Sequence, residues 1–283
     1  MIIMVYEIFE KYWKYLMFFT IILLLFSSAV LLNNLFTKGS ILERDVELSG
    51  GKMINVEVRS ADIEALSKEV PYASIQLATG QTQNLIVKIP FDSNETVVID
   101  TIKKYAEVVG QPSVSSVGPI LGKIFFQQAM FALVVAFVMM ALIVFILFRS
   151  FVPSLIVILA ATTDILVTLA FLHFLGVKLS LTVLAAILTV IGYSVDTDIL
   201  LTSEVLKSNR NVKESIDKAM RTGLTLTATT LAALMSIYLF SGSVVLQQIA
   251  YVLTIGLLID LPATWWTNAG LLRWIDERRA KKS

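Results

Sequence analysis

The 283-residue sequence has no cysteine and a single histidine, His173. Without thiols there is no disulfide, thiol nucleophile, zinc–thiolate site or iron–sulfur cluster. One histidine also lacks the partners that a histidine-based metal site needs, so we expect no cofactor. Charged residues are scarce, at 16% of the chain, whereas soluble domains carry about 25%. The net charge of +1 indicates no broad basic surface for nucleic acid.

Apolar residues make up 56% of the chain and are concentrated in six long runs. A helix needs about 20 apolar residues to cross the hydrocarbon core of a membrane. The predicted spans are Tyr15–Leu32, Ile124–Phe148, Pro153–Leu175, Leu181–Leu206, Met220–Leu239 and Val244–Leu272. The first run is too long for the apolar part of a signal peptide. The sequence therefore predicts a polytopic α-helical membrane protein with six transmembrane helices.

Lysine and arginine lie mainly on one side of this arrangement. They precede the first span, separate spans two from three and four from five, and follow the sixth: Lys11, Lys14, Arg149, Lys207, Arg210, Lys213, Lys218, Arg221, Arg273, Arg278, Arg279, Lys281 and Lys282. Short cytoplasmic loops are rich in such residues, so we expect a plasma-membrane protein with both termini in the cytoplasm. The predicted division is a cytoplasmic N-terminus with the first span (1–38), an extracytoplasmic domain (39–122), a five-span bundle (123–273) and a basic cytoplasmic tail (274–283).

The residues between the first two spans predict a small α+β domain. Strands are expected at Lys52–Arg59, Ala73–Ala78, Asn84–Ile89 and Ser113–Val117, and helices at Ala61–Val70 and Ser93–Val109. Ser60 is a predicted N-cap, Ser93 or Asn94 another, Thr79-Gly80-Gln81 a predicted turn and Gly110 a predicted helix end. The order βαββαβ indicates a ferredoxin-like sandwich. With no histidine, cysteine or clustered triad, it is expected to be a binding or docking module.

Four aspartates lie inside the predicted spans, where an ionisable group costs at least about 2.5–3.5 kcal/mol. They are Asp164 in span three, Asp196 and Asp198 in span four, and Asp260 in span six. Arg221 is the nearest candidate cation. Asp196 and Asp198 are two residues apart and so point about 200° apart around a helix, which prevents both from facing one small pocket. We expect these five residues to form a proton relay, although a structural role for Asp164 and Asp260 stays open.

Hydroxyl side chains accompany the aspartates and predict a hydrated path. Ser194 and Thr202 lie four residues either side of Asp198 and share its face, and Thr197 lies between the two acids. The fifth span adds a stripe that includes Thr225 and Thr229. Hydroxyls in membrane helices also serve packing alone, so both interpretations remain.

The end of the sixth span has two further features. Pro262 marks a helix irregularity, because proline frees a backbone carbonyl. Trp265, Trp266 and Trp274 are expected to form an aromatic belt at the cytoplasmic interface.

Short motifs follow one another along essentially the whole chain. Ile191–Leu201 reads I-G-Y-S-V-D-T-D-I-L-L, and glycine motifs at Glu47–Gly51 and Ser116–Gly122 flank the predicted domain. Further motifs occur in span five at Arg221-Thr222, Thr229–Leu234 and Leu239–Gly242. In this order they resemble the SecF family, accessory subunits of the Sec protein-export machinery.

This resemblance implies that the six spans form one half of an RND-like membrane assembly and that SecD forms the other half. It also implies that the pair associates with the SecY translocon and assists the translocating preprotein within the membrane lipid. Protons are the implied coupling ion, and ATP is not used. The bacterial family motif places its key aspartate on Thr197 and a later Asp-Arg pair on Ser203-Glu204, so the proton-carrying role stays open between Asp196 and Asp198. These departures indicate the archaeal branch of the family.

Two other classes of membrane protein are alternatives. An RND-type exporter of a lipid or small molecule shares the fold but usually has two six-span halves and larger outer domains. An intramembrane aspartyl protease needs Y-D and G-x-G-D motifs, whereas here Tyr193 precedes Ser194 and no G-x-G-D occurs. We therefore expect no enzymatic activity.

Overall fold

The computed structural model describes residues 2–78, 83–207 and 211–280. Within them, six helical segments are long and apolar enough to cross a membrane. These are α1 (Ile2–Lys38), α5 (Pro119–Phe148), α6 (Phe151–Phe174), α7 (Leu181–Lys207), α8 (Val212–Phe240) and α9 (Val244–Pro262), which continues through η1 (Ala263–Asn268) into α10 (Ala269–Ala280). The six predicted spans are thus confirmed, and the chain is a multi-pass membrane protein. The turn predicted at Thr79-Gly80-Gln81 and the basic residues Arg210, Lys281 and Lys282 lie outside the described residues.

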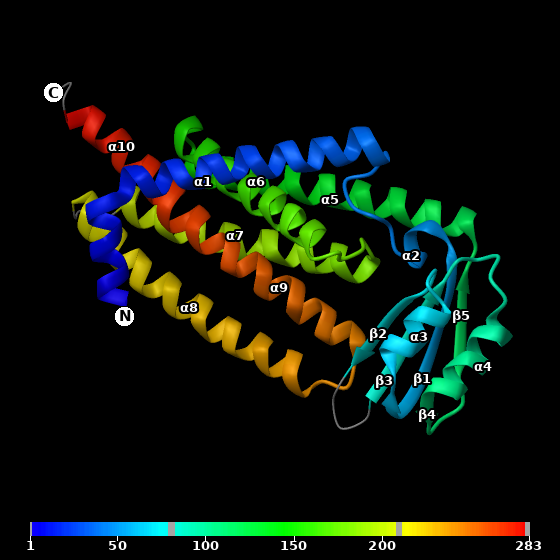
Figure 1. Ribbon diagram of the computed structural model, residues 1–283. Helices are drawn as coiled ribbons and strands as arrows, with labels where there is room; N and C mark the ends of the chain where they lie inside the picture. The colour runs from blue at the N-terminus through cyan, green and yellow to red at the C-terminus, as the bar shows by residue number, and fades with distance from the viewer. Residues whose placement is uncertain (1, 79–82, 208–210, 281–283) are drawn as a thin grey trace.

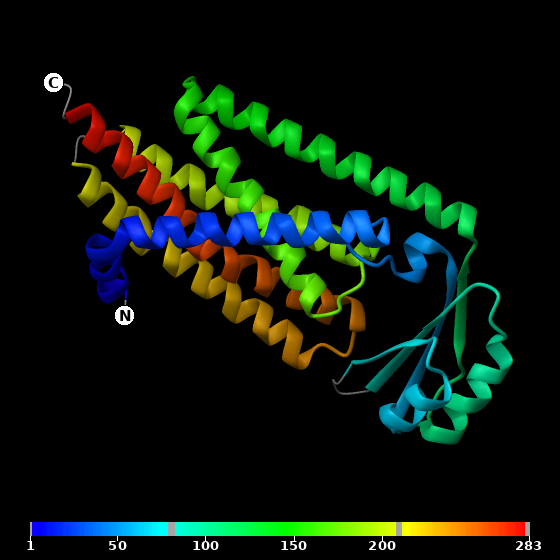
Figure 2. The ribbon, with the colours of Figure 1, turned by 45° about the horizontal axis from the view of Figure 1, so that its top comes forward.

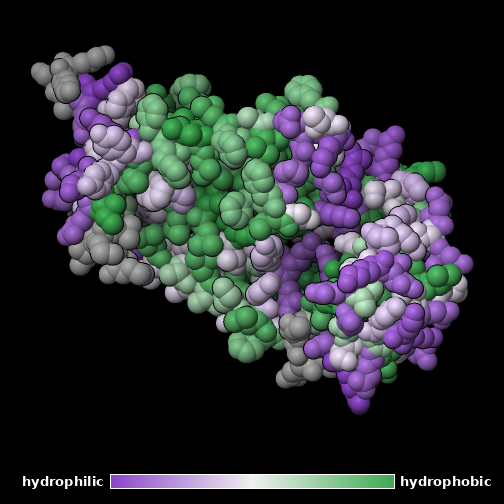
Figure 3. Space-filling view, viewed as in Figure 1, coloured by the Kyte–Doolittle hydropathy of each residue, from purple (hydrophilic) through white to green (hydrophobic). Residues whose placement is uncertain are grey.

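Both chain ends lie at one end of the helix bundle and the small sheet lies at the other (Figure 1). The space-filling view shows a hydrophobic belt over the helices, with hydrophilic residues at the sheet and at the opposite end (Figure 3). This is the surface expected of helices in lipid, where apolar side chains face outward.

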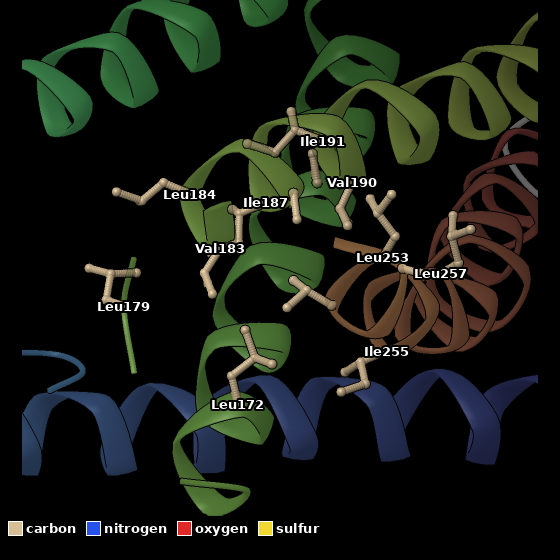
Figure 4. Close-up of a cluster of buried hydrophobic side chains, with 14 of the residues drawn as sticks. Leu172, Leu179, Val183, Leu184, Ile187, Val190, Ile191, Leu253, Ile255 and Leu257 are labelled. Carbon is tan, nitrogen blue, oxygen red and sulfur yellow. The ribbon is translucent and has the colours of Figure 1, made fainter. Parts of the chain in front are cut away.

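The centre of the bundle is built by α6, α7 and α9. Their buried aliphatic side chains, including Leu172, Ile187 and Leu253, interlock in one cluster (Figure 4). A methyl group added at Gly256 would lie 2.4 Å from Val190 Cγ2, so glycine allows α9 to approach α7 closely. By contrast α5 lies at the edge of the bundle (Figure 2). Only 6% of the apolar stretch of α5 is buried, whereas 56% of the corresponding stretch of α6 is buried.

The residues between α1 and α5 form a small domain at one end of the helix bundle (Figure 1); we call it the outer domain, and that end of the bundle its outer end. It contains a short helix and an antiparallel sheet with two helices. Its elements are α2 (Val46–Ser49), β1 (Gly51–Ala61), α3 (Ile63–Glu69), β2 (Ser74–Ala78), β3 (Gln83–Ile89), α4 (Glu95–Tyr105), β4 (Ala106–Val108) and β5 (Ser113–Val117). The strand order is β2-β3-β1-β4, and β5 also pairs with β1. Ile54, Leu85 and Val87 of the sheet form a buried core with Leu66 of α3 and Val98 of α4.

Two predicted helix boundaries in this domain are wrong. Asp62, not Ser60, caps α3, because its Oδ1 accepts a hydrogen bond from Ala65 N at 3.0 Å. The second helix ends at Tyr105 rather than near Gly110. Residues 106–108 leave the helix because they pair with β1, where Ala106 lies opposite Ala61. Of the two predicted caps for that helix, Asn94 is the one used.

The two glycine motifs that flank the domain meet at its junction with α5. Gly50 has a φ of +88°, which favours glycine. A methyl group added at Gly122 would lie 2.7 Å from the backbone nitrogen of Gly50. Pro119 begins α5 beside the same glycine. Backbone therefore packs directly on backbone where the domain meets the membrane helix.

Asp45 joins this junction to the connection between α6 and α7. Its carboxylate forms an ion pair with Lys88 of β3, and both side chains are only 4% exposed. Its Oδ1 also accepts from Val46 N at 2.9 Å, and its backbone N–H donates to Leu179 O at 2.8 Å. One residue thus links the sheet, α2 and the outer end of the bundle.

We predict that Gly122→Ala lowers the free energy of unfolding by about 1–3 kcal/mol, because the added methyl group meets backbone atoms that have no room to move. Thermal unfolding in detergent measures the change. Gly118→Ala is the matched control, since a methyl group there has no heavy atom within 4 Å. Equal melting temperatures for the two variants would contradict the tight junction.

Candidate functional site

Three of the four membrane aspartates meet in the middle of the bundle. Asp164 comes from α6, Asp198 from α7 and Asp260 from α9, and each is 0% exposed. The carboxyls of Asp164 and Asp198 both interact electrostatically with that of Asp260. We call these three residues the acid cluster.

Hydroxyl groups connect the carboxyls of the acid cluster. Ser194 Oγ donates a hydrogen bond to Asp164, and Thr197 Oγ1 lies 3.3 Å from Asp260 Oδ2. Thr264 Oγ1 lies 2.9 Å from Asp198 Oδ1 and 3.0 Å from Asp260 Oδ1. Within the described part of the chain, no ion pair includes any of these carboxyls, so no cation balances their charge.

Thr264 belongs to a π-helical segment that sequence reasoning missed as part of the site. Segment η1 begins directly after Pro262, at the predicted irregularity. It also carries Asn268, whose Nδ2 donates to Asp198 Oδ1 at 2.6 Å. π-Helical turns occur frequently at functional sites. The available signal was the group of polar residues Thr264, Thr267 and Asn268 that follows the proline inside an apolar span.

Asp196 lies outside the acid cluster. It is exposed and lines a cavity of about 270 Å³ between α7 and α8, together with Tyr193 and Thr230. Asp198 and Thr202 are instead fully buried. The two adjacent aspartates thus occupy different faces of α7, as their spacing predicts.

The threonine stripe of α8 also lies apart from the acid cluster. The hydroxyls of Thr225 and Thr229 donate to carbonyls of their own helix, each at 2.8 Å. Both residues are exposed and line a groove of about 600 Å³ beside Pro262 and Trp266. They therefore belong to the outer surface of the bundle rather than to a path through the three carboxyls.

Arg221 does not act as the cation of the acid cluster. Its Nε donates to both carboxylate oxygens of Asp217, at 3.1 and 2.9 Å, and its side chain is 48% exposed. Asp217 lies one turn earlier on α8, so the guanidinium pairs locally instead of reaching inward.

Trp265 is not an interfacial residue. It is 2% exposed and packs against Gly223 of α8, where an added methyl group would lie 2.2 Å from the indole ring. The missing side chain of Gly223 provides the space for this ring, which fixes η1 against α8. Trp274 is 38% exposed, with the Arg278 guanidinium 3.8 Å from its ring centroid.

Within the described ranges, no group of three or more acidic or histidine side chains is arranged to hold a metal ion. One buried oxygen of each of three side chains has no hydrogen-bond partner among these residues: Asp164 Oδ1, Asp198 Oδ2 and Asn268 Oδ1. Each of these oxygens can accept a further hydrogen bond.

Comparison with known proteins places this geometry in context. The family described as "Protein export membrane protein SecD/SecF, C-terminal" matches residues 97–278. The protein-export membrane protein SecF of Methanothermobacter thermautotrophicus is 38% identical over 250 residues, which cover 84% of this chain and 86% of that protein. The SecF of Methanolacinia petrolearia is 46% identical over 172 residues, which cover 60% of this chain and 61% of that protein.

A solved structure shares the fold. The crystal structure of SecDF, a translocon-associated membrane protein from Thermus thermophilus, superposes with a TM-score of 0.74 at 21% identity. The superposition covers 95% of this chain but only 38% of the longer SecDF chain.

We predict that Thr264→Val destabilises the protein by about 1–3 kcal/mol, because it removes a hydroxyl that contacts two buried carboxyls. The melting temperature in detergent reports the effect. Thr254→Val on α9 is the matched control, since its buried hydroxyl has no hydrogen-bond partner among the described residues. A fall in melting temperature as large for Thr254→Val would show that the hydroxyl of Thr264 has no special role.

Proposed function

Because this chain belongs to the SecD/SecF protein-export membrane protein family, we propose that it is a SecF-like accessory subunit of the Sec translocase. It acts with a SecD-like subunit at the SecY translocon to promote translocation of preproteins. The family match over residues 97–278 and the SecF relatives support this role. The chain corresponds to about two fifths of the SecDF chain, as expected for one of two partner subunits.

The acid cluster is the observation that supports proton coupling. Three carboxyls are fully buried, and no ion pair among the described residues includes them. Burying three negative charges without a cation is prohibitively costly, whereas a protonated carboxyl loses most of that cost. The cluster therefore holds protons, and a proton gained or lost changes its hydrogen bonds.

The hydroxyl geometry favours a proton on Asp260. Thr197 Oγ1 lies 2.8 Å from Ser194 O and 3.3 Å from Asp260 Oδ2. A hydroxyl has only one proton to donate. When that proton goes to the nearer carbonyl, Asp260 must donate the second bond. For Thr264 the same count requires either Asp198 or Asp260 to donate one bond. Because a carboxyl carries only one proton, an Asp260 that donates to Thr197 leaves Asp198 as the donor to Thr264.

The route from the acid cluster to the outer domain runs through the α6–α7 connection. These two helices carry Asp164 and Asp198, and their connection contains Leu179, which bonds to Asp45. Leu181 N also donates to Glu47 Oε2 at 3.0 Å. A shift of α6 against α7 on protonation would therefore displace the hydrogen bonds by which the domain joins the bundle.

The orientation we propose places the N- and C-termini in the cytoplasm and residues 39–122 outside the cell. The first turns of α1, the start of α8 and helix α10 lie at the end opposite the domain (Figure 1). Lys213 of α8 and Arg273 of α10 both pair with Glu10 of α1, and cytoplasmic ends are rich in Lys and Arg. The strand order and the two helices support a ferredoxin-like domain. The predicted boundaries at residues 38, 122 and 273 remain part of this proposal.

The SecD-like subunit covers the outer faces of α7 and α8. Asp196 is exposed there, and an exposed carboxyl in lipid is costly. The exposed small residues Thr225, Ala228 and Thr229 line a separate groove on α8, and small residues favour close contact between membrane helices. A second membrane subunit would remove both features from lipid.

Export by cells that carry only a variant chain tests the coupling. Asp198→Asn and Asp260→Asn keep the side-chain shape but remove the exchangeable carboxyl proton. We expect each to reduce precursor maturation to the level of cells that lack the chain. Asp100→Asn, in the exposed face of α4, is the control. Unchanged export at equal membrane levels would rule out coupling through the acid cluster.

Co-purification in mild detergent tests the partner surface. We expect Ala228→Trp to reduce recovery of the SecD-like subunit at least about tenfold, because the indole fills the groove and prevents close helix packing. The control is Leu142→Trp on the exposed surface of α5. Equal recovery with both variants would place the partner elsewhere.

A further inference from the structure

An apolar cavity of about 300 Å³ lies at the outer end of the bundle, between α1, α5, α6 and α7. Its floor consists of the buried side chains of Leu42, Leu179, Leu184 and Ile187. Its rim includes Leu35 and Ile41, which are each 41% exposed. The cavity belongs neither to the acid cluster nor to the groove beside α8.

A single cationic side chain stands at this cavity. Arg44 is exposed, and its guanidinium lies 3.8 Å from the centroid of the Phe126 ring, which also lines the cavity. Stacking of this kind fixes the position of the guanidinium. The neighbouring acid, Glu43, pairs with Lys38 at 3.6 Å. Among the described residues Arg44 has no ion pair, so its donors are free to bind an anion.

We propose that this cavity binds one hydrocarbon chain of a membrane lipid whose phosphate contacts Arg44. The apolar floor matches a hydrocarbon chain, and a guanidinium matches a phosphate through paired hydrogen bonds. Only Gly122 and Val144 of α5 are fully buried, and the helix lies at the edge of the bundle (Figure 2), so lipid has direct access. The Gly39–Arg44 segment leads from α1 into the outer domain, which is the level where lipid headgroups lie.

The size of the cavity favours a hydrocarbon chain over a protein helix. A helix with its side chains is about 10–12 Å across and rises 5.4 Å per turn, so one turn occupies roughly 500 Å³. The cavity, at about 300 Å³, is smaller than one turn. A space of this size is suited to a single extended hydrocarbon chain, which is much narrower than a helix.

Native mass spectrometry of the purified chain in a maltoside detergent tests the site. The probes are phosphatidylglycerol and a diacylglycerol with the same acyl chains, which lacks the phosphate. We expect one tightly retained phosphatidylglycerol per chain. Arg44→Gln should weaken its binding about tenfold, because a charge-assisted hydrogen bond is lost, and should leave diacylglycerol binding unchanged. Leu133→Trp, which fills the cavity from α5, should weaken both.

The matched control is Arg149→Gln, at the other end of α5 and away from the cavity, which should bind like the unaltered chain. Three results would overturn the proposal. They are unchanged phosphatidylglycerol binding in Arg44→Gln, equally strong binding of diacylglycerol to the unaltered chain, and loss of the bound lipid when the SecD-like subunit is added. The last would identify the cavity as part of a subunit interface. Export activity is not the readout, so failure here leaves the translocase role untouched.

Discussion

The burial of three carboxyl groups in an apolar helix bundle is the constraint on which the rest of this structure depends. Asp164, Asp198 and Asp260 need neutral hydrogen-bond partners, since no ion pair among the described residues includes them. These partners come from α7 and from the π-helical segment. The requirement explains why α6, α7 and α9 form the tight centre, while α5 lies at the edge with little buried surface. Close approach at Gly256 and Gly223 follows from the same need.

The outer domain is attached to this centre by backbone contacts more than by side chains. Gly50 and Gly122 let the domain pack directly on the start of α5, and Asp45 bonds to the connection between α6 and α7. The buried ion pair between Asp45 and Lys88 also fixes the orientation of the sheet, because separating the two side chains would leave an uncompensated buried charge. The sheet is therefore held at the helices that carry two of the three acids.

The sequence predicted the spans, four of the five strands and the opposed faces of Asp196 and Asp198, because hydrophobic length and residue spacing are local properties. The short strand β4 was taken as the end of a helix, since only its pairing with β1 distinguishes it. It did not predict that Arg221 pairs with Asp217, since both the inward and the local partner were compatible with its position. Trp265 was expected at the membrane interface because tryptophan is common there. Its ring is instead buried against Gly223, which lies far away in the sequence. Thr264 and Asn268 were missed because the wider turn after Pro262 decides which way they point. Such long-range choices depend on packing and have no local signature.

The π-helical segment has a consequence for how this chain can vary in length. On one side of it, Asp260 is tied to the acid cluster, and on the other, Arg273 forms an ion pair with Glu10 of α1 at 2.7 Å. Between them Trp265 is fitted against Gly223. Deleting or inserting one residue would rotate everything that follows by about 100° and separate these contacts. The residue count between Asp260 and Arg273 is therefore fixed.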